Sequence, residues 1–172
     1  MRVFLIGFMG SGKSTIGKKL ATKAGLKFID LDNETENLMG FSIQDAFALK
    51  GEEFFREQEV KALKRCLNEN DALISVGGGT PCFGENIQLM LNAGVVIYLK
   101  MTKKDLNHRL SQNRGNRPLL LSLNENELEA YINTTLDNRE NYYNLADITV
   151  SGKDFNAKKY NELTEQIQNY VK

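Results

Sequence analysis

The most restrictive feature of this sequence is a glycine-rich segment that directly follows a short apolar run. Residues 7–15 read Gly-Phe-Met-Gly-Ser-Gly-Lys-Ser-Thr and match the pattern G-x-x-x-x-G-K-[ST]. The preceding residues 3–6 are apolar and typical of a buried strand, and residues 16–24 continue as a helical pattern. Glycines in this setting let successive backbone N–H groups surround a phosphate at the positive end of a helix. We therefore expect nucleotide binding.

Two side chains of this segment have a direct use in phosphate chemistry. Lys13 can reach the outer phosphates of a nucleotide, and the Ser14 hydroxyl can ligate Mg²⁺. The alternative is a glycine turn that only joins a strand to a helix and binds nothing. The complete motif, with a strand before it and a helix after it, favours the phosphate loop.

Short apolar runs alternate with longer helical patterns along the rest of the chain. Continuous β-branched runs predict strands that are covered on both faces. Their alternation with helices predicts a doubly wound α/β fold, in which a five-stranded parallel sheet forms the middle of three layers. Capping patterns at Thr102 and Asn124 indicate two helix starts. The five predicted strands cover residues 3–6, 28–29, 72–76, 95–99 and 148–150.

Two segments interrupt this alternation. Residues 33–69 read as two or three consecutive helices and form a helical insertion, expected to bind substrate, between the second and third strands. Residues 111–123 lack a clear period and are expected to form a mobile loop, or lid. A length of 172 residues suits one domain, so residues 1–172 are expected to fold as a single unit.

Composition excludes several classes of protein. The 22 Lys and Arg residues balance the 22 Asp and Glu residues, whereas a general nucleic-acid binder carries a basic excess. Cys66 and Cys82 cannot form a disulfide framework, and a single His leaves little for a zinc site. No apolar run approaches the roughly 20 residues of a membrane span, and the apolar run at the start is too short for a signal peptide. We expect a cytoplasmic monomer that binds neither nucleic acid nor membrane.

The position of the acidic residues separates this chain from common nucleotide-binding classes. It has neither the Asn-Lys-x-Asp motif of regulatory GTPases nor the Leu-Ser-Gly-Gly-Gln signature of transporter ATPases. The third strand ends in glycines rather than in an acidic residue, so a carboxylate for the metal must come from elsewhere. Asp30 and Asp32 end the second strand, and period-two alternation places them on one side of the ligand crevice. Alternatively, Asp32 or Asn33 only caps the following helix.

The remaining candidates are three consecutive glycines and three arginines. Gly77, Gly78 and Gly79 allow the backbone to approach a ligand closely, although a flexible turn has the same composition. The residues alone leave two roles open for each arginine, either an ordinary ion pair with neighbouring carboxylates or a contact with an anionic ligand. The arginines concerned are Arg56, Arg117 and Arg139.

This ordered set of motifs resembles the shikimate kinases, which share the phosphate-loop fold of the nucleoside monophosphate kinases. The similarity covers nearly the whole chain, from Val3 to the last strand. After the phosphate loop no single motif is specific, but their order is. The motifs are residues 7–17, Asp30-Leu31-Asp32, Gly40 with Ser42-Ile43, Gly51-Glu52 with Phe55-Arg56 and Glu59, Gly77-Gly78-Gly79, Arg117-Pro118-Leu119-Leu120, and Arg139 with Tyr143 and Ala146.

The resemblance implies an activity and a role for each matching residue. The activity is ATP- and Mg²⁺-dependent phosphorylation of the 3-hydroxyl of shikimate, which gives shikimate 3-phosphate and ADP on the pathway to aromatic amino acids. The implied catalytic residues are Lys13, Asp32 and Arg117. The implied ATP site is Gly10, Ser11, Gly12, Lys13, Ser14, Thr15 and Arg117, and the metal site is Ser14 with Asp30 acting through water. The implied shikimate site is Asp32, Arg56, Gly77, Gly78, Gly79 and Arg139.

Some assignments stay open on the sequence. Lys153 is the candidate for the adenine end, with Arg109 and Arg114 as weaker ones. Asp32 can either accept the hydroxyl proton or only orient the hydroxyl, because positioning and charge neutralisation dominate phosphoryl transfer. The competing functions are another small-molecule kinase, such as a gluconate or nucleoside monophosphate kinase, and a nucleotide-dependent binding protein without turnover.

Overall fold

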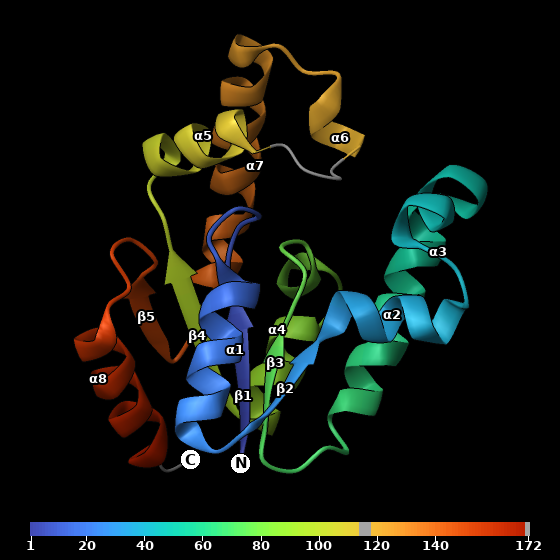
Figure 1. Ribbon diagram of the computed structural model, residues 1–172. Helices are drawn as coiled ribbons and strands as arrows, with labels where there is room; N and C mark the ends of the chain where they lie inside the picture. Colours follow the sequence, from blue (N-terminus) through green and yellow to red (C-terminus); the bar gives the residue numbers. More distant parts are fainter. Residues whose placement is uncertain (114–117, 171–172) are drawn as a thin grey trace.

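The protein is built on a five-stranded sheet in which every paired strand is parallel to its neighbour (Figure 1). The computed structural model describes residues 1–113 and 118–170. The strand order is β2-β3-β1-β4-β5. The strands are Arg2–Ile6 (β1), Lys27–Asp30 (β2), Ala72–Ser75 (β3), Val95–Lys100 (β4) and Ile148–Ser151 (β5). The predicted α/β fold and its five parallel strands are confirmed.

Helices cover both faces of the sheet, with α1 and α8 on one face and α4 among those on the other (Figure 1). The helices are Lys13–Ala24 (α1), Leu31–Met39 (α2), Ile43–Cys66 (α3), Asn86–Ala93 (α4), Lys103–Gln112 (α5), Pro118–Leu121 (α6), Glu125–Tyr143 (α7) and Ala157–Gln168 (α8), and Thr80–Cys82 forms a short 3₁₀ helix (η1). In the part of the chain that the structure describes, no helix is long and apolar enough to cross a membrane.

The two apolar cores explain why the strands are continuous apolar runs. Val3 and Leu5 of β1 belong to the core beneath α1 and α8, whereas Phe4 and Ile6 belong to the core on the opposite face. All four side chains are fully buried. Because side chains alternate across a strand, a strand that is covered on both faces needs apolar residues at every position.

The segment between β2 and β3 is helical, as its pattern predicted, and consists of α2 and α3. Ser42 caps α3, where its hydroxyl accepts a hydrogen bond from the N–H of Asp45 at 3.0 Å. Gly51 has φ 83° and ψ 174° inside α3, which breaks the helical geometry and divides α3 at a kink. The second half of α3 then packs inward, so that Phe55 and Glu59 are both buried.

The segment 111–123, expected to be a loop, is partly helical where the structure describes it. Residues 111–112 still belong to α5, and Pro118–Leu121 form the short helix α6. The expectation of an irregular loop is therefore wrong for these two parts. A single-turn helix is too short to show a period in sequence, which explains the error. Two of the candidate arginines, Arg114 and Arg117, lie outside the described residues.

Helix α1 approaches the sheet so closely that it needs a glycine. A Cβ at Gly17 would lie 2.8 Å from a ring carbon of Phe28 and 3.3 Å from methyl carbons of Leu5 and Leu73. We predict that Gly17→Val lowers the free energy of unfolding by about 1–3 kcal/mol through overpacking. Urea denaturation checks this, with Lys19→Val on the exposed face of the same helix as the control. Equal stability of the two variants would contradict close packing at Gly17.

Candidate active site

The phosphate loop joins β1 to α1 at the carboxyl end of the sheet. Gly10 and Gly12 have φ values of 80° and 97°, a backbone region that favours glycine. Gly12 is the N-cap of α1 and places no side chain over the helix end. The N–H groups of the first helical turn are therefore open to a ligand, at the positive end of the helix dipole. This is the geometry of an anion site.

Lys13 folds across the loop that precedes it. Its Nζ donates hydrogen bonds to the carbonyl oxygens of Gly7 at 2.7 Å and Phe8 at 3.0 Å. Ser11 is fully buried, and its hydroxyl has no hydrogen-bond partner among the described residues. The loop is thus held in shape by its own lysine, with the ammonium group beside the anion site.

The two aspartates after β2 are not arranged as period-two alternation predicted. The strand ends at Asp30, which is the N-cap of α2, and its carboxylate accepts a hydrogen bond from the N–H of Asp32 at 3.2 Å. Asp32 lies in the first helical turn and not on a strand. The expectation that both extend the strand is wrong, as is the alternative that Asp32 or Asn33 caps the helix, because Asp30 does so. Both aspartates nevertheless line the same cleft.

Asp32 has a strongly perturbed acidity. Its pKa is raised from 3.8 to about 6, chiefly by burial and also by the neighbouring carboxylates of Asp30 and Glu59, while Lys13 opposes the rise. The side chain keeps access to solvent through the open cleft, but protein atoms crowd it on its other sides. A carboxylate with a pKa near neutrality, next to an anion site, is suited to accept a proton.

The glycine turn after β3 leaves no room for side chains. A Cβ at Gly77 would lie 2.9 Å from Glu59 Oε1 and 3.0 Å from Asp32 Oδ1. At Gly79 it would collide with the guanidinium of Arg56, and at Gly78 it would lie 3.2 Å from Arg139 Nη1. The nearest atoms are polar or charged and not apolar, and the three glycines let the backbone approach two arginines and two carboxylates at once.

Arg56 reaches the turn from α3, where carboxylates hold it on two sides. Its Nη1 donates to Glu59 Oε2 at 2.9 Å, while Nε and Nη2 donate to Glu52 Oε1 at 3.3 and 3.2 Å. Burial alone would lower the pKa of Arg56, but Glu59 and Glu52 raise it above its usual value. The sequence left open whether Arg56 forms ion pairs or contacts a ligand. The ion pairs are present, and Arg56 also lies beside Gly79 of the turn.

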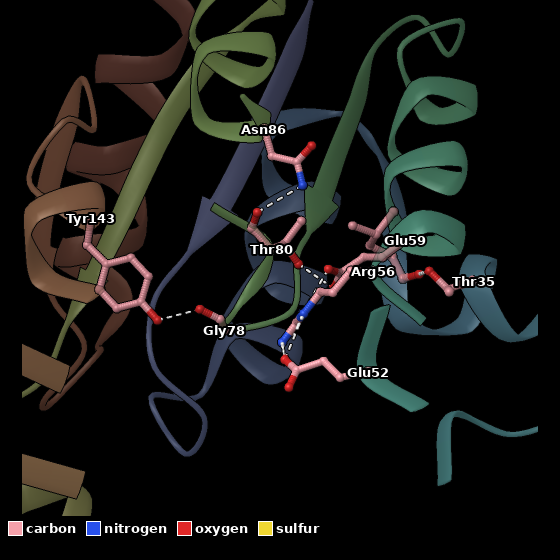
Figure 2. A network of polar contacts seen from close by, with 9 residues as sticks. Thr35, Glu52, Arg56, Glu59, Gly78, Thr80, Asn86 and Tyr143 are labelled. Atoms are coloured by element: carbon pink, nitrogen blue, oxygen red, sulfur yellow. Dashed lines mark hydrogen bonds and ion pairs between the residues drawn. The ribbon is translucent and has the colours of Figure 1, made fainter. Parts of the chain in front are cut away.

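Arg139 approaches the turn from α7, on the side of Gly78. Its guanidinium carbon lies 5.7 Å from the centroid of the Phe8 ring, within the range of a cation–π contact. Within residues 1–113 and 118–170, no carboxylate lies within ion-pair distance of Arg139. Tyr143, one turn further along α7, donates its hydroxyl to the carbonyl oxygen of Gly78 at 2.6 Å (Figure 2). Arg139 is therefore a cation available to a ligand at the turn.

Most of the predicted site residues line one open cleft of about 500 Å³. Of the predicted residues, the cleft wall includes Gly10, Gly12, Lys13, Ser14, Thr15, Asp30, Asp32, Gly77 and Gly78. Gly79, Arg56 and Arg139 are outside this wall and adjoin it through the glycine turn. Ser11 is buried under the loop, and Arg117 is outside the described residues. The structure thus brings the predicted nucleotide-binding residues of the phosphate loop and the predicted substrate-binding residues together around the glycine turn.

Sequence reasoning did not assign roles to several residues that shape the site. Glu59 and Thr80 are buried and hydrogen-bonded to each other at 2.6 Å. Arg109, considered only for the adenine end, donates to the carbonyl oxygens of Gly10 and Ser11 at 3.3 and 3.2 Å. Lys153, the leading adenine candidate of the three, pairs with Asp105 at 3.3 Å. The i,i+3 spacing of Arg56 and Glu59 was the one local signal for Glu59, since the other contacts join distant segments.

The oxygens near the phosphate loop suit a hard divalent cation. The Ser14 hydroxyl donates to Asp30 Oδ2 at 3.2 Å, so a hydroxyl and a carboxylate face the cleft together. Among the residues described, no cluster of three or more His, Cys, Asp or Glu side chains could hold a metal alone. Mg²⁺ is commonly bound by one or two carboxylates and by phosphate and water oxygens. The donor set therefore fits a Mg²⁺ ion that arrives with a nucleotide.

Comparison with known proteins identifies the family. A family model described as "Shikimate kinase" matches residues 9–171. This chain belongs to the shikimate kinase family. A curated shikimate kinase from Parabacteroides distasonis is 43% identical over 158 residues, which cover 92% of this chain and 88% of that one. Another, from Chlorobium chlorochromatii, is 41% identical over 179 residues, covering 99% of this chain and 92% of that one.

Solved structures of shikimate kinases have the same fold. The crystal structure of the enzyme from Bacteroides thetaiotaomicron has a TM-score of 0.88 at 31% identity, covering 98% of this chain and 96% of that one. The enzyme from Acinetobacter baumannii, solved in complex with shikimate, has a TM-score of 0.81 at 28% identity, with 97% and 90% coverage. The predicted family, kinase class and fold are confirmed.

The raised pKa of Asp32 predicts a pH-dependent loss of stability in the metal-free protein. Between about pH 4 and pH 6 the folded chain binds more protons than the unfolded chain, so the free energy of unfolding falls as pH rises. Asp32→Asn removes this loss, and we expect it to be more stable than the parent at pH 7.5 by about 1 kcal/mol, after solvent screening in the open cleft.

Urea denaturation in EDTA at pH 4.5, 5.5, 6.5 and 7.5 measures this effect. The difference in unfolding free energy between Asp32→Asn and the parent should grow with pH and level off above about pH 7. A difference of constant size across the series would mean that Asp32 does not titrate in this window.

Proposed function

We propose that this chain transfers the terminal phosphoryl group of ATP to the 3-hydroxyl of shikimate, giving shikimate 3-phosphate and ADP. The observation that carries this proposal is the glycine turn, which brings Asp32, Arg56 and Arg139 next to the phosphate loop. Shikimate has hydroxyls and one carboxylate, so it needs a proton acceptor at the reacting hydroxyl and cations at the carboxylate. Asp32 lies beside Gly77, Arg139 beside Gly78 and Arg56 beside Gly79.

In this proposal the phosphate loop binds the nucleotide. The N–H groups from Gly10 to Thr15 would bind the phosphates, with Lys13 leaving its loop carbonyls to neutralise the outer ones. Arg109 would lie toward the adenine end, because it links the loop to the Gly152 carbonyl at 3.4 Å. Arg117 keeps the role that the resemblance gives it, a cation on the transferring phosphate. In a loose transition state such positioning and neutralisation supply most of the catalysis.

Ser14 and Asp30 would hold Mg²⁺, with Asp30 acting through water. The ion would neutralise the phosphate charge that develops during transfer. Asp30 has a second task as the N-cap of α2, so its carboxylate is already oriented by the Asp32 N–H. The same helix start would therefore direct Asp30 to the metal and Asp32 to the acceptor.

In this proposal Asp32 and the two arginines bind the acceptor, shikimate. Asp32, with its raised pKa, would hydrogen-bond the acceptor hydroxyl and receive its proton as the bond to phosphorus forms. Arg56 and Arg139 would hold the shikimate carboxylate together with the Gly78 N–H. Arginine forks match a planar carboxylate, so they fix the orientation of the ring and the direction of the attacking hydroxyl.

Wider properties remain predictions from the sequence. We expect one domain over residues 1–172, a cytoplasmic monomer, and no nucleic-acid or membrane partner. Size-exclusion chromatography with light scattering tests the oligomeric state directly.

An acceptor panel tests the proposed reaction. Purified protein with ATP and Mg²⁺ is given shikimate, gluconate or a nucleoside monophosphate, and the phosphorylated product is identified by mass spectrometry. We expect turnover of shikimate alone, and none with Lys13→Ala, which serves as the control for a contaminating kinase. Faster turnover of gluconate or of a nucleotide would contradict the proposal, and no turnover with any acceptor would favour a nucleotide-dependent binding protein.

Arg139→Ala tests the assignment of the carboxylate site. Losing a charge-assisted hydrogen bond to the substrate should raise the KM for shikimate about 10- to 100-fold, while the KM for ATP changes less than about twofold. Arg139→Lys keeps the positive charge but loses the planar guanidinium, so its KM for shikimate should lie between those of the parent and Arg139→Ala. Arg65→Ala, on the exposed face of α3, is the control. A weaker affinity for ATP in Arg139→Ala would place this residue at the nucleotide.

A further inference from the structure

A buried polar network lies directly behind the glycine turn (Figure 2). Thr80 is the first residue after Gly79 and is fully buried. Its hydroxyl donates a hydrogen bond to Glu59 Oε1 at 2.6 Å. This contact joins the end of the turn to the middle of α3, across 21 positions of sequence. The turn and the helix that carries Arg56 are therefore linked by a side chain that has no direct access to substrate.

Glu59 is a carboxylate with a side chain that is only 1% exposed. Its Oε1 accepts from Thr80, and its Oε2 accepts from Arg56 Nη1 at 2.9 Å. A buried carboxylate is costly unless hydrogen bonds and an opposite charge compensate it. Thr80 supplies one of these two compensating contacts, and Arg56 supplies the other.

The guanidinium of Arg56 has an inner and an outer edge with different partners. The inner edge, Nη1, is bound to the buried Glu59. The outer edge, Nε and Nη2, is bound to Glu52, whose side chain is 65% exposed. Exposed ion pairs contribute little and exchange readily, whereas a buried pair is fixed. The outer edge is thus the one that an incoming carboxylate can take from Glu52.

Thr80 itself is held in place by the backbone of the turn and by α4. Its N–H donates to the Gly77 carbonyl oxygen at 3.2 Å, and its own carbonyl oxygen accepts from the Asn86 side chain at 3.0 Å. Asn86 is also buried. The Thr80 hydroxyl is consequently held toward Glu59 by a rigid support, which is what a positioning group requires.

We propose that Thr80 is a positioning residue for substrate binding, which acts through Glu59 to hold the Arg56 guanidinium with its outer edge toward the shikimate carboxylate. This inference rests on the proposed role of Arg56. In this proposal Thr80 influences two contacts to the substrate. It directly follows the turn that offers the Gly78 N–H, and it orients the arginine beside Gly79. Both contacts to the shikimate carboxylate then have a fixed mutual geometry.

Thr80→Val tests the proposal, because it keeps the shape of the side chain and removes the hydroxyl. We expect the KM for shikimate to rise about 5- to 20-fold, while kcat and the KM for ATP stay within about twofold. Thr80→Ser restores the hydroxyl and should bring the KM for shikimate within about threefold of the parent. Thr164→Val is the matched control, since it removes a buried hydroxyl that donates to a helix carbonyl on α8, away from the site.

Two results would overturn the proposal. One is a KM for shikimate that Thr80→Val leaves unchanged or raises no more than Thr164→Val does. The other is a loss in Thr80→Val that kcat, the KM for ATP and the KM for shikimate share equally, or that Thr80→Ser fails to rescue, because a merely structural role acts in that way.

A second comparison covers the case in which Thr80→Val does not fold. Glu59→Gln removes the buried charge, so the double variant Glu59→Gln/Thr80→Val leaves no carboxylate without a donor. With the anchor of Arg56 already lost in Glu59→Gln, adding Thr80→Val should change the KM for shikimate less than about twofold. A further rise of fivefold or more in this background would show that Thr80 does not act through Glu59.

Arg56→Lys separates this inference from the proposed function. If Arg56→Lys leaves the KM for shikimate unchanged, the role proposed for Arg56 is wrong. If Arg56→Lys raises that KM and Thr80→Val does not, the role of Arg56 holds and the inference about Thr80 fails.

Discussion

The pairing of β1 between β3 and β4 determines where the functional groups of this chain can meet. The register of β1 and β3 brings the phosphate loop after Ile6 beside the glycine turn that follows β3. A Cβ at Gly78 would lie 3.4 Å from both the Gly7 carbonyl oxygen and the Met9 nitrogen, so the two loops are in contact. In the proposed function, the distance between the donor phosphate and the acceptor would thus be set mainly by backbone pairing, and the side chains would supply charge and orientation.

Charges of both signs are concentrated at this edge of the sheet. Three carboxylates, Asp30, Asp32 and Glu59, lie near the cations Lys13, Arg56 and Arg139, so the zero net charge of the whole chain does not describe the local charge at this edge. The crowding that raises the pKa of Asp32 is unfavourable for the folded protein at neutral pH. Sites that concentrate like charges often carry such a cost, because the chemistry needs a group whose pKa lies near the working pH.

The sequence predicted those features that depend on neighbours along the chain. Strands covered on both faces, the phosphate loop and the caps at Thr102 and Asn124 follow from local patterns, and the structure has them. The geometry of Asp32 was missed because the strand ends two residues earlier than alternation suggested, at the capping residue Asp30. The bond from Thr80 to Glu59 joins residues 21 positions apart through packing, and no period or spacing in a single sequence records such a contact.

The sequence offered ion pairing and ligand binding as alternative roles for Arg56. In the structure the two roles are compatible, because the ion pair with Glu59 occupies only one edge of the guanidinium. A free arginine side chain loses much conformational entropy when a ligand fixes it, and a buried pair on one edge removes part of that loss beforehand. Arg139 reaches the same turn without a carboxylate partner among the described residues, and the Phe8 ring and Tyr143 hold it instead. One arginine is thus oriented by a buried charge and the other by aromatic side chains. In the proposed function, a carboxylate between them would meet two cations whose directions are set independently, and this would fix the substrate ring more firmly than either contact alone.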